Sequence, residues 1–233
     1  MIALLAAATL AQGQNTPDWH DIVQNGFKDA KFVARAVKGD QKELKKINDD
    51  FGQSFRFTKT TAYVKEPFML RMESEVEDTK LMYVLNGGKK VYHLGRVKYT
   101  DNVEKAPGKR QTLFEFGILT PSLFKEFFIA KYIRTDSASG DYVFDVTYNP
   151  KYDDSSRFRI WVDKEKKIVN KRVWFAQEGH QRATFIYENA KKVDGIWFPT
   201  RCTVKNVDDK VAGITEYEQI SINPGLPDSL FKV

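Results

Sequence analysis

Three histidines, His20, His93 and His180, are the side chains best suited to acid–base chemistry or metal binding. They lie far apart, and none of them is spaced as His-x-His or His-x-x-x-His, which would place two imidazoles on one face of an element. A zinc or iron site needs several converging ligands. We therefore expect no metal and no cofactor, and we expect His180 to lie exposed in a turn.

Nucleophilic and carboxylate chemistry has equally weak support. The single cysteine, Cys202, lies in an alternating apolar run, which predicts a buried thiol without an intramolecular disulfide. Glu73 and Glu75 share one strand face, as expected for a solvated surface rather than a glycosidase pair. Glycine-rich phosphate loops and the G-x-S-x-G motif are absent from the sequence. We therefore expect that the protein is not an enzyme.

The charge pattern gives little support for a nucleic-acid site. The net charge is +6, but the basic residues are dispersed along the 233 residues. Their densest stretch, Lys164–Arg172, also contains Glu165 and apolar residues, as in a turn between two strands. This pattern predicts a solvated surface and no nucleic-acid partner. No run of 18 apolar residues occurs, so we expect no membrane span.

The first residues are apolar and small, and a polar stretch follows them. This order is typical of a secretory signal, which we place at residues 1–14. A basic start is missing, so an apolar N-terminus without a targeting role is the alternative. Residues 15–233 then form a single domain, a length at which one chain can bury a substantial core.

The elements of this domain divide into two classes. Thr16-Pro17-Asp18 predicts a helix start, and apolar spacing extends that helix to about Ala36. Asp40 predicts the cap of a second helix that ends near Gly52. Beyond residue 54, alternating runs separated by turns such as Asn86-Gly87-Gly88 predict about ten antiparallel strands. The fold class is therefore α+β, a curled antiparallel sheet covered by helices.

One further helix is predicted between the strands, over residues 121–132. Thr120-Pro121 supplies its start, and its apolar face is wide for so short a segment. We expect this helix to act as a lid over the sheet. The lid side chains are Phe124, Phe127 and Phe128, and Phe127→Asp is expected to weaken acyl-chain binding while leaving the fold largely intact.

A curled sheet of about ten strands encloses more volume than its side chains readily fill, as in small barrels that hold ligands. The 17 Phe, 10 Tyr and 4 Trp residues supply apolar bulk for such a groove and for the core. Alternation along the strands selects one face as the lining. The candidate ligand-binding residues are Leu70, Met72, Met82, Val84, Tyr92, Leu94, Phe144, Val146, Ile160, Val173 and Phe185.

Several segments, in this order, resemble one known family. They are Tyr63–Met72, Asn86–Tyr92, Ile160-Trp161-Val162-Asp163, Val193–Thr200 and Asn223–Phe231. The chain resembles the LolA-like outer-membrane lipoprotein-sorting proteins over nearly its whole mature length. The resemblance implies an unclosed β half-barrel with helices over its open side. It also implies a periplasmic location in a Gram-negative-type envelope.

The resemblance implies a carrier that binds lipid or lipoprotein acyl chains, with inner- and outer-membrane proteins as donor and acceptor partners. One position departs from the family pattern. The family carrier has an arginine with a role in opening just before this proline, whereas this chain has Glu66, so that role is not transferred. The alternatives are an envelope sensor or protein-interaction module on the same scaffold, and a lipid or glycan hydrolase, for which no polar triad or dyad is evident.

Overall fold

Antiparallel strand pairing dominates the fold. The computed structural model describes residues 16–76 and 78–233, and the predicted signal peptide at residues 1–14 lies outside them. Thirteen strands join in one sheet, and β12 and β13 form a separate hairpin. All of the strand pairs are antiparallel, as the turn signals in the sequence predict.

The strands of the first half are β1 (Asp29–Gly39), β2 (Lys59–Lys65), β3 (Met69–Val76), β4 (Thr79–Asn86), β5 (Lys89–Leu94) and β6 (Val97–Asn102). Those of the second half are β7 (Phe128–Thr135), β8 (Tyr142–Tyr148), β9 (Arg157–Val162), β10 (Val169–Phe175), β11 (Gln181–Glu188), β12 (Lys191–Val193), β13 (Ile196–Phe198), β14 (Arg201–Lys205) and β15 (Val211–Ile222). The helices are short: α1 (Gln41–Lys45), α2 (Asp49–Ser54) and α3 (Pro121–Glu126), with 3₁₀ turns η1 (Trp19–Asp21), η2 (Pro107–Lys109), η3 (Leu113–Phe116) and η4 (Asp228–Phe231).

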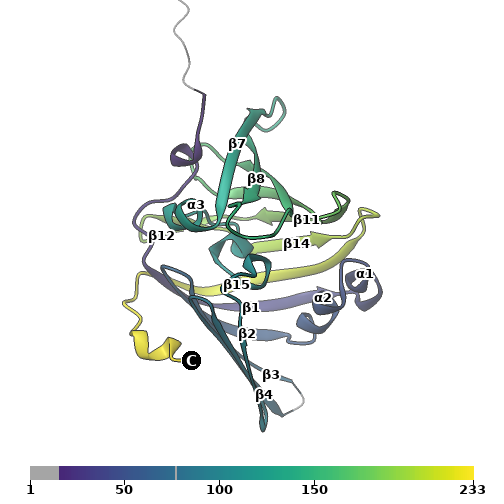
Figure 1. The fold of residues 1–233 in the computed structure, drawn as a ribbon, viewed down its shortest axis with the longest axis vertical. Coiled ribbons are helices and arrows are strands. Elements are labelled where there is room, and N and C mark those ends of the chain that lie inside the picture. Colours follow the sequence, from purple (N-terminus) through teal and green to yellow (C-terminus); the bar gives the residue numbers. More distant parts are fainter. Residues whose placement is uncertain (1–15, 77) are drawn as a thin grey trace, which may run out of the picture.

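The order of strands in the large sheet is β6-β5-β4-β3-β2-β1-β15-β14-β11-β10-β9-β8-β7. The sheet curls but does not close, since β6 and β7 are its two edges (Figure 1). The prediction of an antiparallel curled sheet is confirmed. The predicted number of about ten strands was too low, and the helical cover is smaller than expected.

The predicted N-terminal helix was wrong over most of its length. Only the 3₁₀ turn η1 forms, and Gly26 then turns the chain with a φ of +88°. Residues 29–39 form β1 instead, with Ala30, Phe32 and Ala34 on its inner face. With Val33 and Ala36 they form a short apolar run that fits both the strand period and the helix period, and pairing with β2 and β15 decides between the two.

The predicted helix at 121–132 was too long. Helix α3 ends at Glu126, and Phe128 already begins edge strand β7. Residues 128–135 pair with β8, which satisfies backbone groups that a continued helix would have bonded internally. The segment is therefore a short helix of six residues that leads directly into a strand.

The C-terminal segment covers the outer face of β3 and β4. Leu226 and Phe231 form a small apolar cluster with Val84. Hydrogen bonds hold the same segment, from Asn86 Nδ2 to the Phe231 carbonyl at 3.1 Å and from Lys65 Nζ to the Leu226 carbonyl at 2.6 Å. These contacts anchor the C-terminal segment to the sheet.

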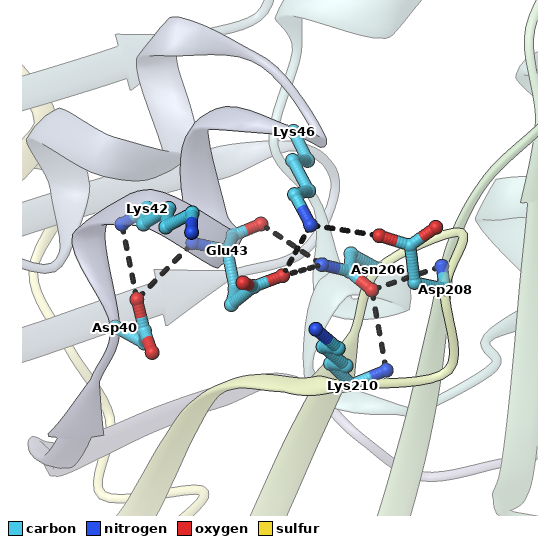
Figure 2. A network of polar contacts seen from close by, with 7 residues as sticks. All are labelled: Asp40, Lys42, Glu43, Lys46, Asn206, Asp208 and Lys210. Atoms are coloured by element: carbon cyan, nitrogen blue, oxygen red, sulfur yellow. Dashed lines mark hydrogen bonds and ion pairs between the residues drawn. The ribbon is translucent and has the colours of Figure 1, made fainter.

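A polar network ties α1 to the turn between β14 and β15 (Figure 2). Buried Asn206 donates to the Glu43 carboxylate at 2.6 Å and accepts from the backbone N–H of Asp208. Lys46 bridges Glu43 at 2.9 Å and Asp208 at 2.7 Å. Asp40 caps α1, as predicted. The network fixes the start of the α1–α2 segment against the sheet.

Candidate apolar ligand cavity

A cavity of about 280 Å³ lies between the inner face of the sheet and the segments α2 and η3. Most of its lining is apolar. The lining residues are Ala34, Ala36, Phe51, Phe55, Phe57, Thr60, Ala62, Leu70, Met72, Gln111, Glu115, Phe116, Arg172, Phe185, Cys202, Val204, Thr215 and Tyr217. Its size is near the lower end of the range of about 300–1,000 Å³ that is typical of small-molecule sites.

Small side chains on β1 and β2 leave this space open. Ala34 lies between Thr60 of β2 and Tyr217 of β15, and Ala62 pairs with Met72 of β3. Interiors are otherwise packed to a density that leaves few voids larger than a water molecule. A run of small residues on the inner face of two central strands is therefore what creates the cavity.

Two aromatic side chains of the α2 segment, Phe51 and Phe55, cover the cavity at one end of the strands. Phe55 lies directly against the backbone, because a Cβ at Gly213 would be 2.4 Å from its ring and a Cβ at Gly39 would be 3.3 Å away. Gly39 and Gly213 are cross-strand partners. This glycine pair lets α2 approach the sheet closely, as glycine in a strand often does.

A second cavity of about 440 Å³ adjoins the first and is more polar. The two share Phe51, Gln111, Glu115, Arg172 and Phe185. The remaining lining of the second cavity consists of Gly108, Tyr148, Asp154, Ser156, Phe158, Trp174, Ala176, Gln177, Glu178 and Arg182. The two cavities therefore share part of their walls, and one is more apolar than the other.

Arg172 stands at the junction of these cavities and is only 4% exposed. Its guanidinium lies over three rings, 4.0 Å from the centroid of Phe185, 4.7 Å from that of Phe114 and 5.8 Å from that of Phe158. Nη1 donates to the Phe114 carbonyl at 3.4 Å and lies 3.7 Å from the nearer carboxylate oxygen of Glu115. The site thus places a cation inside largely apolar walls.

Two further ionisable side chains of the apolar cavity, Cys202 and Tyr217, are neutral at physiological pH. Burial raises the pKa of the Cys202 thiol to about 12, and burial also raises the pKa of Tyr217. Because a thiolate is the reactive form of cysteine, Cys202 is a poor nucleophile in this setting. The prediction that Cys202 is buried is confirmed.

The structure brings only some of the predicted lining residues to the cavity. Leu70, Met72 and Phe185 lie on its wall. Phe144, Val146 and Ile160 belong to the fully buried core of β8 and β9. Tyr92 packs at the edge of that core, and Leu94 is 46% exposed.

Three predicted lining residues face the opposite side of the sheet, which corrects the inferred strand parity. Met72 pairs with Tyr83, so the neighbouring residues Met82 and Val84 of β4 point outwards, towards the C-terminal segment. Val173 of β10 pairs with Arg159, because a bulge between Val169 and Lys171 shifts the register of β10 by one residue.

The predicted lid residues pack into the core and do not line either cavity. Phe127 is 1% exposed, stacks on Tyr152 and lies edge-on to Phe68. Phe124 and Phe128 are also buried in the main core. The expectation that Phe127→Asp leaves the fold intact is therefore corrected, since the substitution would remove a fully buried ring and bury a carboxylate in its place. Burying that charge is costly even though the Arg110 guanidinium lies 4.4 Å from the Phe127 ring. The cover of the cavity comes from α2 and η3.

Glu66, the position that departs from the family pattern, does contact α3. Its carboxylate accepts hydrogen bonds from Thr120 Oγ1 at 2.8 Å and from Ser122 Oγ. Burial raises the pKa of Glu66, and the two hydroxyl donors partly oppose that shift. This contact fixes the start of α3 at the end of the strands opposite α2 (Figure 1).

Other kinds of site find no support in the part of the chain that the structure describes. Within residues 16–76 and 78–233, no three His, Cys, Asp or Glu side chains gather as metal ligands. Over the same residues, no helix has the length and apolar character that crossing a membrane requires.

Arg172 is the functional candidate that the sequence did not reveal. Its place in the basic stretch Lys164–Arg172 predicted a solvated side chain, and in the turn at Asp163–Lys167 the side chains of Lys164 and Glu165 are indeed exposed. The same bulge that turns Val173 outwards turns Arg172 inwards, opposite Ile160 and Phe185. If β9 and β10 paired without a bulge, Arg172 would lie opposite Arg159 and face away from the core. Its inward orientation is therefore evident only from the observed register.

Comparisons with known proteins agree with this architecture. A family model described only as that of an uncharacterized protein matches residues 119–233, and no curated protein matches the chain. A LolA superfamily protein from Nitrosomonas europaea is similar in structure, with 14% identity, a TM-score of 0.59 and coverage of 91% of this chain and 93% of that one.

Two further solved structures are similar over most of both chains. A DUF1329 family protein from Desulfovibrio piger has 11% identity and a TM-score of 0.59, covering 89% of this chain and 91% of its own. An outer membrane lipoprotein-sorting protein domain from Vibrio parahaemolyticus has 12% identity and a TM-score of 0.56, covering 90% and 91%. The chain therefore has the fold of the LolA superfamily, as its sequence motifs predicted.

Proposed function

We propose that the protein is a lipid carrier that holds a hydrocarbon chain in the cavity between α2, η3 and the inner face of β1–β3. The observation that carries this proposal is an apolar cavity of about 280 Å³ whose space depends on Ala34, Ala36 and Ala62. Burying each methylene of a chain there contributes about 0.8 kcal/mol before entropy costs. A chain of about twelve carbons then contributes roughly 10 kcal/mol before the costs of association are subtracted.

The shared fold supports the same function. One structure with this fold is that of an outer membrane lipoprotein-sorting domain. By analogy with it, we propose an exported, periplasmic protein that takes a lipid or lipoprotein acyl chain from a donor and passes it to an acceptor. The residues that we propose to touch the chain are Leu70, Met72 and Phe185, as the sequence predicted, together with Ala34 and Phe55.

A cavity-filling substitution tests this function. Ala34→Phe would place a ring in the cavity, so we expect it to weaken binding of 1-dodecanol at least tenfold. Displacement of the neutral fluorophore N-phenyl-1-naphthylamine measures the affinity. Val37→Phe is the matched control, because it adds the same ring to β1 at an exposed position. Equal affinity of both variants for 1-dodecanol would refute the assignment of this cavity.

A protein-interaction module on the same scaffold is the second candidate. The observation that favours it is the apolar edge of the sheet, where Val97 and Tyr99 of β6 are 67% and 56% exposed. If no hydrocarbon chain displaces the fluorophore from the wild-type protein, this function replaces the carrier function.

A further inference from the structure

The buried guanidinium of Arg172 has bonding capacity that the protein leaves unused. Among the described residues, its Nε is buried without any hydrogen-bond partner. The single hydrogen bond from Nη1, to the Phe114 carbonyl, is long at 3.4 Å. A buried cation in apolar surroundings is costly unless it is paired and hydrogen-bonded, so this arrangement favours an additional anionic partner.

The carboxylate of Glu115 does not meet this need. Its nearer oxygen lies 3.7 Å from Nη1, beyond hydrogen-bond distance. Its other oxygen accepts from the backbone N–H of Thr112 at 2.7 Å and from the Thr112 hydroxyl at 3.1 Å, as the capping box of η3. Glu115 thus forms an ion pair with Arg172, but its hydrogen bonds go to η3 and leave donors of the guanidinium unfilled.

A second arginine lines the same polar cavity. Arg182 lies at a bulge of β11, and its Nε is likewise buried without a partner among the described residues. Besides Glu115, two carboxylates line that cavity: Asp154, which accepts from the backbone N–H of Ser156, and Glu178, which is 69% exposed. Glu178 is therefore screened by water, whereas the two arginine Nε atoms are enclosed.

We propose that Arg172 binds the anionic head group of a single-chain amphiphile whose hydrocarbon tail lies in the apolar cavity, with Arg182 adding positive charge at the polar end. The inference rests on the proposed function and specifies its ligand class. Carboxylate and phosphate both suit the planar fork of an arginine, which donates two parallel N–H bonds. The junction position of Arg172 places the head group between the two cavities and the tail beneath α2.

Three ligands of equal chain length separate the head group from the tail: dodecanoate, dodecyl phosphate and 1-dodecanol. Displacement of N-phenyl-1-naphthylamine from the full chain at pH 7.5 gives their affinities. In the wild type we expect the better of the two anions to bind roughly ten- to a hundredfold more tightly than the alcohol, the range for a hydrogen-bonded charge. The preferred anion distinguishes a carboxylate from a phosphate ligand.

Arg172→Gln should abolish this preference, so that the two anions and 1-dodecanol bind the variant with similar affinity. Arg159→Gln is the matched control, since it removes the same charge from the outer face of neighbouring strand β9 and should keep the preference. If Arg172→Gln fails to fold, Arg172→Lys keeps the charge without the fork and should reduce the preference.

Two other results would contradict the proposal. Equal binding of anions and alcohol by the wild type, or a preference that survives in a folded Arg172→Gln protein, overturns the head-group site and leaves the hydrocarbon cavity in place. Failure of all three ligands to displace the fluorophore overturns both the head-group site and the carrier function.

Discussion

At the scale of single residues, two charged side chains, Arg172 and Glu66, lie in largely apolar surroundings. Arg172 enters the cavity because a β-bulge reverses the facing of β10. Glu66 enters the interface between β2 and α3, where Thr120 and Ser122 donate to it. Neither orientation follows from residue type, because both residues are usually solvated.

Glu66 gives a pH-dependent prediction. Burial raises its pKa above the value of 4.5 that it has when unfolded, so the folded state binds this proton more tightly. The stabilisation from Glu66 is therefore complete below pH 4.5 and is lost as the pH rises through the folded-state pKa. Glu66→Gln removes the buried charge and still accepts from Thr120, so it should be more stable than wild type at pH 7.5.

Urea unfolding at several pH values checks this prediction. The difference in unfolding free energy between Glu66→Gln and wild type should shrink as the pH falls and vanish below about pH 4. Glu165→Gln, in the turn after β9, is the control and should show no such trend. A Glu66→Gln protein that is less stable than wild type at pH 7.5 would show that the charged hydrogen bonds dominate.

At the scale of elements, α2 is the segment that determines whether the cavity is covered. It is a short helix, so its own hydrogen bonds cannot hold it in place. It depends on the α1 network at one side and on the contact of Phe55 with Gly39 and Gly213 at the other. Helix α3, which the sequence predicted as the lid, instead packs into the core at the opposite end of the strands.

Gly213→Val tests the role of α2. The new side chain would overlap the Phe55 ring and force it away from the sheet, which should destabilise the protein by about 1–3 kcal/mol, as overpacking does, and weaken 1-dodecanol binding. Thermal unfolding and the displacement assay measure the two effects.

The double variant Gly213→Val, Phe55→Ala removes the overlapping ring and is the internal control. It should recover part of the lost stability, since the two residues are in direct contact. If the double variant is no more stable than the sum of the single changes predicts, the close approach of Phe55 does not explain the glycine at position 213.

At the scale of the whole molecule, the sequence predicted the curled antiparallel sheet because turns and alternation are local signals. Asn86-Gly87-Gly88 and Asp163–Lys167 each join paired strands, as expected. The predicted N-terminal helix extends to about Ala36 because a short apolar run fits both periods, and only strand pairing across the molecule shows that these residues form β1.

The sequence predicted an apolar cavity but not most of the residues that line it. Its floor of Ala34, Ala36 and Ala62 depends on the pairing of β1 and β2 with each other, and a register shift by one residue reverses every facing. Met82, Val84 and Val173 were selected by counting along single strands, so one error in parity moved each to the outer face.

The most direct test is a crystal structure of the full chain with 12-bromododecan-1-ol, in which anomalous scattering locates the end of the tail. The central claim is that a hydrocarbon chain lies between α2 and the inner face of β1–β3. We expect one bromine peak within the cavity lined by Ala34, Phe55 and Met72. A bromine peak elsewhere on the protein, with this cavity empty, would contradict the claim.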